Sequence, residues 1–209
     1  MRRPIPPVTR ALITANVLAF GAELAFGDRF LVPLALWPLG TPTLLASEVN
    51  GSFHVWQLLT YAFLHGSGLH LFFNMFALHM FGGEIERVFG GWRYLEYYGV
   101  AVVAAAVTQL VVLGVKGGAP YPTIGASGGV FGLLLAFGVL FPQRMMMLIF
   151  PPVPMRAWLL VTLYGALELY LGVTGTAEGI AHFAHLGGML GGWLLLRRWR
   201  SLAARSDAW

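Results

Sequence analysis

The stretch Gly125-Ala126-Ser127-Gly128-Gly129-Val130-Phe131-Gly132 places one hydroxyl among glycines at the start of an apolar segment. Two prolines and Gly125 break regular structure just before it, so a helix is predicted to begin at Ser127 and to run to Phe141. A serine at such a position commonly serves as an N-cap. The octapeptide alone therefore favours a structural role for Ser127, and any chemical role has to be argued from the rest of the chain.

The composition is that of an integral membrane protein. Of the 209 residues, 11% are charged and 57% are hydrophobic, and the mean hydropathy is +0.71. Soluble domains carry roughly one-quarter charged residues. Apolar runs cover nearly the whole chain, so we expect one membrane domain over residues 1–209, with short tails at about 1–10 and 197–209. Cysteine is absent, which excludes disulfides and thiol chemistry.

Six apolar segments are predicted to be membrane-spanning helices, for which about 20 residues are typical. A cleaved signal peptide is the alternative for the first segment, but the charge distribution described below needs that segment as a span. The fold class predicted is all-α: a polytopic bundle of six transmembrane helices. The spans are expected at residues 11–26, 68–85, 94–115, 127–141, 157–171 and 180–196.

A long segment at residues 27–66 separates the first two spans and is expected to rest on the membrane. Prolines, glycines and charges divide it into apolar pieces that are too short to span. Its part at 53–64 carries Trp56 and Tyr61, and aromatic anchors of this kind are typical of an interfacial segment. The connector at 142–156 contains a run of methionines, which we interpret as apolar filler.

The distribution of lysine and arginine predicts the topology. With six spans, both termini lie on one side of the membrane, and only Arg29 and Lys116 fall on the other. Because basic residues mark the cytoplasmic side, both termini are predicted to be cytoplasmic in a multi-pass protein of the cell inner membrane. The basic residues form no single patch, so no nucleic-acid partner is expected. Eleven basic residues lie on the terminal side: Arg2, Arg3, Arg10, Arg87, Arg93, Arg144, Arg156, Arg197, Arg198, Arg200 and Arg205.

The depth of Ser127 gives it a further meaning. The fourth span is roughly 22 Å long at about 1.5 Å per residue, against a hydrocarbon core of about 30 Å. If the span ends at the cytoplasmic boundary, Ser127 lies roughly 8 Å below the outer one. Non-helical backbone at that depth is tolerated only when it is buried in protein or lines a water-filled cavity. The sequence therefore predicts a wet cavity beside Ser127.

Polar residues inside spans are costly and indicate function. His70 and Asn74 are four residues apart in the second span and share one helical face. In the sixth span, His185, Gly188 and Gly192 lie on one stripe. Polar groups suited to chemistry are thus present on two helices besides the one that carries the serine.

Glycines predict that the fourth and sixth spans pack closely. Small residues at this spacing let two helix backbones approach, and Gly128 and Gly132 form a stripe that matches the one in the sixth span. Docking of the two stripes would bring His185 beside Ser127. The alternative is that the stripes are ordinary packing and that His185 is a bystander.

A serine hydroxyl becomes a nucleophile when a base takes its proton, and the oxyanion that follows needs donors. His185 is the candidate base, and the backbone N–H of Ser127 at a helix N-terminus is a candidate donor. His70 and Asn74 can supply further donors. No acidic residue is obviously placed to orient His185, so the prediction is a Ser-His dyad rather than a triad. Glu168, near the outer end of the fifth span, is interpreted as part of a substrate gate or as a helix cap.

Metal binding is the alternative role for the histidines. His182 and His185 stand three residues apart, but the H-E-x-x-H pattern is absent and no acidic residue accompanies them in the sixth span. We therefore expect neither a metal nor another cofactor.

Taken together, these pieces resemble the rhomboid family of intramembrane serine proteases. The resemblance rests on G-A-S-G at 125–128, H-x-x-x-N at 70–74, A-H-L-G-G at 184–188 and a G-x-x-E turn within 82–87. It covers residues 53 to 196 and implies a six-helix bundle with Ser127 as nucleophile, His185 as base, and His70 and Asn74 as oxyanion donors. It also implies that the substrates are transmembrane segments of other proteins, which enter from the lipid bilayer.

Two positions depart from the family pattern. Where many bacterial members have Trp-Arg in the first loop, this chain has Trp56-Gln57, and where some members have a tyrosine four residues after the serine it has Phe131. Stacking of Phe131 on His185 remains open, but a hydroxyl role does not. Two other functions were weighed. A catalytically silent relative that binds transmembrane helices would be expected to lack the serine or the histidine, and a transporter or channel would be expected to carry charges inside several spans.

Overall fold

The structure is a computed structural model that describes residues 4–40, 51–117, 121–147, 152–175 and 181–206. Most of these residues are helical. In chain order the helices are α1 (Pro7–Phe26), α2 (Asp28–Leu34), α3 (Gln57–Thr60), the 3-10 turn η2 (Tyr61–Phe63), α4 (Gly68–Ala77), the π-helical turn η3 (Leu78–Gly82), α5 (Gly83–Phe89), α6 (Gly91–Lys116), α7 (Ser127–Leu140), α8 (Ala157–Thr174) and α9 (His182–Ser206).

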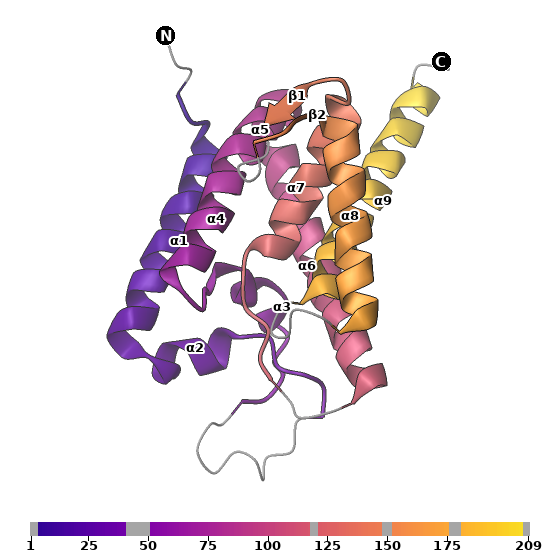
Figure 1. The fold of residues 1–209 in the computed structure, drawn as a ribbon. Helices are drawn as coiled ribbons and strands as arrows, with labels where there is room; N and C mark the ends of the chain where they lie inside the picture. The colour runs from indigo at the N-terminus through magenta and orange to yellow at the C-terminus, as the bar shows by residue number, and fades with distance from the viewer. Residues whose placement is uncertain (1–3, 41–50, 118–120, 148–151, 176–180, 207–209) are drawn as a thin grey trace.

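Long helical rods form a bundle in which α9 packs against both α6 and α7 (Figure 1). The rods are α1, the continuous α4–η3–α5, α6, α7, α8 and α9. They agree with the predicted spans, although α1 begins four residues earlier than expected and α9 runs on past residue 196. Helix α1 begins and α9 ends at the same end of the bundle, while α2 and α3 lie at the opposite end (Figure 1).

The fold is that of an all-α polytopic membrane protein, as predicted. Within the described residues, α1, α6 and α8 are each long and apolar enough to cross a membrane, and α7 is a shorter apolar helix of 14 residues. The outer surfaces of α1 and α8 expose large apolar side chains, among them Leu24 at 75% and Val173 at 70%. Such surfaces suit a lipid environment. The count of six spans stays a prediction.

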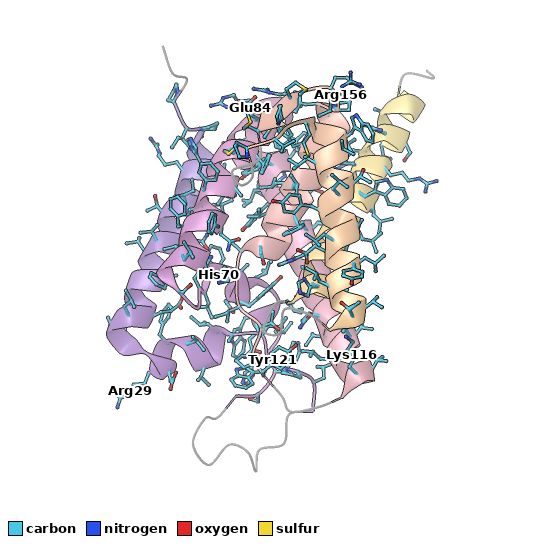
Figure 2. The ribbon with its side chains drawn as sticks, in the orientation of Figure 1. Arg29, His70, Glu84, Lys116, Tyr121 and Arg156 are labelled. Carbon is cyan, nitrogen blue, oxygen red and sulfur yellow. The ribbon has the colours of Figure 1, made fainter. Side chains whose placement is uncertain are left out.

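Four charged residues mark the two ends of the bundle. Glu84 and Arg156 lie at the end where the chain begins and ends, whereas Arg29 and Lys116 lie at the other (Figure 2). At the first end, Glu84 forms ion pairs with Arg87 and Arg144, each at 3.1 Å. This separation is what the lysine and arginine distribution predicted for the two sides of a membrane.

Helix α1 is capped by a residue from far along the chain. Its N-terminus begins with prolines and has no side-chain cap of its own. The carboxylate of Glu86 in α5 accepts hydrogen bonds from the backbone N–H of Val8 at 2.9 Å and of Thr9 at 2.7 Å, and from the Thr9 hydroxyl at 2.7 Å. An anion suits the positive end of a helix dipole, so Glu86 fixes α1 against the α4–η3–α5 rod.

The first loop packs into the protein more deeply than expected. Tyr61 is 2% exposed, and its hydroxyl donates to the backbone oxygen of Val102 in α6 at 2.9 Å. The prediction that Tyr61 is an interfacial anchor is therefore wrong, because its hydroxyl finds a partner inside the bundle. Trp56 is 48% exposed and donates to the Pro33 oxygen at 2.9 Å.

Gln57 holds this loop together. Its side chain is fully buried, and its oxygen accepts from the backbone N–H groups of Trp37 and His54, both at 3.2 Å. Its amide nitrogen donates to the backbone oxygens of Ser52 at 2.9 Å and Pro33 at 3.3 Å. One amide thus ties together two stretches of the loop that are about 20 residues apart. Where the resemblance would lead one to expect arginine, this chain therefore has a buried glutamine whose side chain forms four hydrogen bonds.

The methionine run forms regular structure, so the interpretation as filler is wrong. Strand β1 (Met145–Met147) pairs antiparallel with strand β2 (Pro154–Arg156), with Met146 opposite Met155. The run alternates in exposure: Met146 packs against the core, while Met145 and Met147 are 58% and 62% exposed. This period of two is that of a strand. The residues between the strands at 148–151 lie outside the described part.

Candidate active site

Ser127 is the first residue of α7, but its side chain does not cap the helix. The cap position is Ala126, and no side-chain hydrogen bond caps this end. Instead, the Ser127 hydroxyl oxygen lies 2.8 Å from Nε2 of His185 in α9. That distance is typical of a hydrogen bond, so the structure brings the predicted serine and histidine into contact.

Close packing of α7 and α9 makes this contact possible. A Cβ on Gly188 would overlap the backbone carbonyl of Gly128, and one on Gly132 would lie 3.2 Å from the carbonyl oxygen of Gly188. The predicted glycine docking is therefore present at these three positions. Gly192 differs: a Cβ there would collide with the Tyr97 side chain of α6, so this glycine packs against a different helix than expected.

The segment before Ser127 is held by the first loop. Leu36 and Thr123 exchange two backbone hydrogen bonds, at 3.0 and 2.9 Å. The backbone N–H of Gly125 donates to the backbone oxygen of Tyr61 at 2.9 Å. Gly125 has a φ of 129°, which favours glycine. Residues 118–120, which belong to the predicted non-helical approach, lie outside the described part.

His70 and Asn74 lie on the other side of the serine. A Cβ on Gly125 would lie 3.0 Å from Nε2 of His70 and 3.6 Å from the Ser127 hydroxyl oxygen, so the imidazole and the hydroxyl flank one glycine. The amide nitrogen of Asn74 donates to the His70 backbone oxygen at 3.0 Å, which leaves its second N–H for another partner. Figure 2 shows His70 midway along the bundle, away from both charged ends.

An acidic residue lies within hydrogen-bond distance of His185, contrary to the prediction. Oε2 of Glu168 in α8 lies 2.9 Å from Nδ1 of His185 and 2.7 Å from Nδ1 of His182. The reason is tertiary: the carboxylate comes from the fifth predicted span and meets the sixth from the side. The interpretations of Glu168 as a gate or as a helix cap did not foresee this contact.

Glu168, His182 and His185 offer three ligand atoms within 4.8 Å of one another, a set that could hold a metal ion. The expectation of no metal considered only acids in the sixth span and missed this carboxylate. The separations of 2.7 and 2.9 Å between Nδ1 and Oε2 are hydrogen-bond distances. Two ligands on one zinc ion, each about 2.0–2.1 Å from it, would stand further apart in a tetrahedral site. The three side chains are therefore arranged for hydrogen bonding in this structure.

Phe131 completes the surroundings of His185. Its ring stacks on the imidazole with the centroids 4.3 Å apart and the planes 5° from parallel. The imidazole is thus held at Nε2 by Ser127, at Nδ1 by Glu168 and on one face by an aromatic ring.

The site lies in a cavity of about 1080 Å³. Ser127, His185, His70 and Asn74 all line it, and the wall continues through apolar side chains of α4, α7 and α8. Large, mostly apolar cavities with a few convergent polar groups are typical binding sites. A cavity is therefore present beside Ser127, as predicted, and its filling by water stays a prediction.

The arrangement has the parts of a nucleophilic site. Nε2 of His185 is placed to take the Ser127 proton. The first α-helical hydrogen bond of α7 is donated by the N–H of Val130 to the backbone oxygen of Ala126. Three N–H groups come before it, those of Ser127, Gly128 and Gly129. N–H groups at the positive end of a helix attract an oxyanion.

Fold and site define a polytopic helical membrane protein with a serine–histidine pair in an internal cavity. Residues 52–199 match the family described as the Rhomboid domain. The chain therefore belongs to the rhomboid family.

Curated relatives carry the family's name. The chain is 32% identical to rhomboid protease GluP of Bacillus subtilis over 138 residues, which cover 66% of this chain and 24% of the relative. It is 32% identical to rhomboid protein 1, mitochondrial, of Saccharomyces cerevisiae over 195 residues, covering 87% and 50%. It is 40% identical to rhomboid protease GlpG of Haemophilus influenzae over 80 residues, covering 38% of each. The chain thus spans between about a quarter and a half of the length of these relatives.

Proposed function

We propose that this protein is an intramembrane serine endopeptidase that cleaves transmembrane segments of other membrane proteins. Ser127 attacks the scissile carbonyl, and His185 takes the serine proton as general base and passes it to the leaving amine. Water then hydrolyses the acyl-enzyme on Ser127, again with His185 as the base, which releases the second product and restores the serine hydroxyl. The observation that carries the proposal is the contact of 2.8 Å between the Ser127 hydroxyl and Nε2 of His185 inside the cavity. Membership of a family whose relatives include named proteases supports it.

The oxyanion is stabilised by donors from two helices. The backbone N–H of Ser127 comes from the start of α7, and His70 and Asn74 reach the same cavity from α4. The mixture of backbone and side-chain donors is suited to a tetrahedral intermediate. Gly128, Gly132 and Gly188 let α7 and α9 approach closely enough for the pair to form.

Substrate reaches the site from the lipid. The cavity wall is mostly apolar, with Phe73 and Phe76 from α4 and Tyr164 from α8 among its lining residues. A helix from the bilayer can pack against such a wall without exposing its backbone to lipid. The basic end of the bundle, with both termini, faces the cytoplasm of a cell whose inner membrane holds the protein as one domain.

A catalytically silent protein that binds transmembrane helices is the second candidate, because the same cavity suits binding alone. A serine-directed mechanism-based inhibitor distinguishes the two. Wild-type protein in detergent is labelled, digested and analysed by mass spectrometry, with Ser127→Ala as the negative control and Ser201→Ala, an exposed position in α9, as the matched control. The expected adduct is on Ser127 in the wild type and in Ser201→Ala. Absence of the adduct would leave the binding protein as the better description.

A further inference from the structure

One carboxylate oxygen lies within hydrogen-bond distance of two imidazoles beside the proposed nucleophile. Oε2 of Glu168 is within 2.9 Å of Nδ1 of both His182 and His185. The side chains of all three residues are at most 10% exposed. An ionised carboxylate only accepts hydrogen bonds, so both imidazoles donate from Nδ1. The contact therefore selects one tautomer of each neutral histidine.

That tautomer is the one a general base needs. With its proton on Nδ1, a neutral His185 carries its lone pair on Nε2, which faces the Ser127 hydroxyl at 2.8 Å. The Ser127 hydroxyl then donates to Nε2 of His185, and Nδ1 of His185 donates to Glu168. Each of the two hydrogen bonds thus has one donor and one acceptor. The opposite tautomer would turn an N–H toward the serine and leave the hydroxyl without its acceptor.

Separate contacts fix the helix end that carries Glu168. The Lys116 ammonium at the end of α6 donates to the Gly172 backbone oxygen at 3.2 Å and lies 5.0 Å from the centre of the Phe183 ring. A Cβ on Gly172 would meet that ring at 3.0 Å. The last turn of α8 is thus packed against the first turn of α9, which holds the carboxylate in register with the two histidines.

We propose that Glu168 is a positioning residue that extends the Ser127–His185 pair to a Ser-His-Glu relay, and that His182 holds the carboxylate in place. The proposal rests on the proposed protease function. The serine proton moves to Nε2 of His185, the Nδ1 proton stays on the imidazole, and Glu168 remains a carboxylate that stabilises the positive charge. The proton then passes from Nε2 to the leaving amine, which leaves an acyl-enzyme on Ser127 and a neutral His185. Water then attacks the acyl carbonyl while Nε2 takes its proton, and transfer of that proton to the Ser127 oxygen releases the carboxylic acid product and restores the starting state.

A purely structural tie between α8 and α9 is the competing explanation. It predicts lower thermal stability but an unchanged rate per folded molecule. Glu168→Gln separates the two, because the amide has nearly the same shape and carries no charge. Glu96→Gln, an exposed position in α6, is the matched control for the same chemical change.

The experiment measures kcat and KM for cleavage of a single-span reporter, the rate at which a mechanism-based inhibitor labels Ser127, and the thermal midpoint in detergent. Glu168→Gln is expected to lower kcat and the labelling rate by about 10²-fold or more with KM within about threefold. His182→Gln, which leaves the bond between His185 and Glu168 in place, is expected to lower kcat by less than about tenfold.

Two results would overturn the proposal. One is labelling of Glu168→Gln at the wild-type rate, and the other is a loss in His182→Gln as large as that in Glu168→Gln. Failure of the proposed function itself looks different, since the wild-type protein would then neither cleave the reporter nor be labelled on Ser127.

Discussion

The ring of Phe131 lies flat on the imidazole of His185, with centroids 4.3 Å apart and planes 5° from parallel. Phe131 follows Ser127 by four residues, about one turn of α7. The same helix therefore contacts the imidazole twice, once through a hydroxyl and once through an aromatic face. Stacking needs no hydroxyl, so the phenylalanine found where some family members have tyrosine can still pack against the His185 ring.

Phe131→Ala is expected to lower kcat about tenfold, because the imidazole loses its stacking partner and gains rotational freedom. Aromatic pairs contribute about 0.5–1.5 kcal/mol, which corresponds to a factor of about 2 to 10. Phe131→Tyr keeps the ring and should stay within about threefold of the wild type. Phe26→Ala, at an exposed position of α1, is the control for loss of a ring. Reporter cleavage under saturating substrate gives kcat, and a tyrosine variant as slow as the alanine variant would exclude stacking as the reason.

Asn74→Ala is expected to slow cleavage less than loss of Ser127 does. The amide reaches the cavity and has one N–H to spare, but the N–H of Ser127 and the imidazole of His70 lie in the same site. Loss of one oxyanion donor costs roughly 3 kcal/mol or less when others remain, which is a factor of about 10². Steady-state kinetics checks this, with the thermal midpoint as a control for folding. An effect as large as that of Ser127→Ala would mean that Asn74 has a different role.

Gln57→Ala is expected to destabilise the protein by about 2–4 kcal/mol. The substitution leaves the buried N–H groups of Trp37 and His54 without their acceptor, and each unpaired buried group costs about 1–3 kcal/mol. The thermal midpoint in detergent measures the loss. Leu59→Ala, at an exposed position two residues further on, should change the midpoint little. Because Gln57 does not line the cavity, kcat per folded molecule should stay near the wild-type value, and a selective loss of kcat would contradict the structural role.

Gly188→Ala is expected both to destabilise the protein and to slow it. Its Cβ would overlap the Gly128 carbonyl, so α7 and α9 must separate, and with them Ser127 and His185. Overpacking of this kind costs about 1–3 kcal/mol. Gly99→Ala in α6 is the control, since a Cβ there meets nothing within 4 Å, and it should stabilise the helix by about 0.5–1 kcal/mol. Wild-type activity in Gly188→Ala would show that the helices need not touch at this point.

His65 is expected to make the protein sensitive to acid. It lies in the first loop, is 1% exposed and has its ring 5.0 Å from that of His70. Burial, and to a smaller degree the neighbouring imidazole, lower the pKa of His65 to about 4 from its ordinary value of 6.5. Between these values only the unfolded chain binds the proton, so stability is lost as the pH falls from about 6.5 to about 4.

His65→Leu removes this proton uptake. Thermal midpoints measured from pH 7 to pH 4 should therefore fall less steeply in the variant than in the wild type. If the thermal midpoints of the two proteins fell equally steeply with pH, His65 would not be the cause of the acid sensitivity.

The sequence by itself determined the helices and the position of the proposed nucleophile. Long apolar runs predicted the main rods to within a few residues at most ends, because a helix is the form in which such a run satisfies its own backbone in lipid. The glycines predicted which two helices pack closely enough to join Ser127 and His185, since a missing Cβ is a property of the residue itself.

Only the tertiary structure decided which groups from distant segments meet. Glu168 was interpreted as part of a gate or as a helix cap, and its contact with His182 and His185 depends on how α8 is rotated against α9. A carboxylate shows in the sequence, but the direction in which it points does not. The pair His182 and His185, three residues apart, was the one signal that could have suggested a shared partner.

Burial in the first loop also depends on partners from distant segments. The sequence pattern suggests that Tyr61 and Gln57 are interfacial or polar surface residues, yet both are buried. The partner of Tyr61 comes from α6, and Gln57 has partners about 20 residues away in the loop. Local pattern reports how a residue suits water or lipid, whereas burial depends on partners that satisfy its polar atoms. The sequence therefore supplied the proposed nucleophile and its proposed base, and the packing of α8 and of the first loop decided which groups surround them.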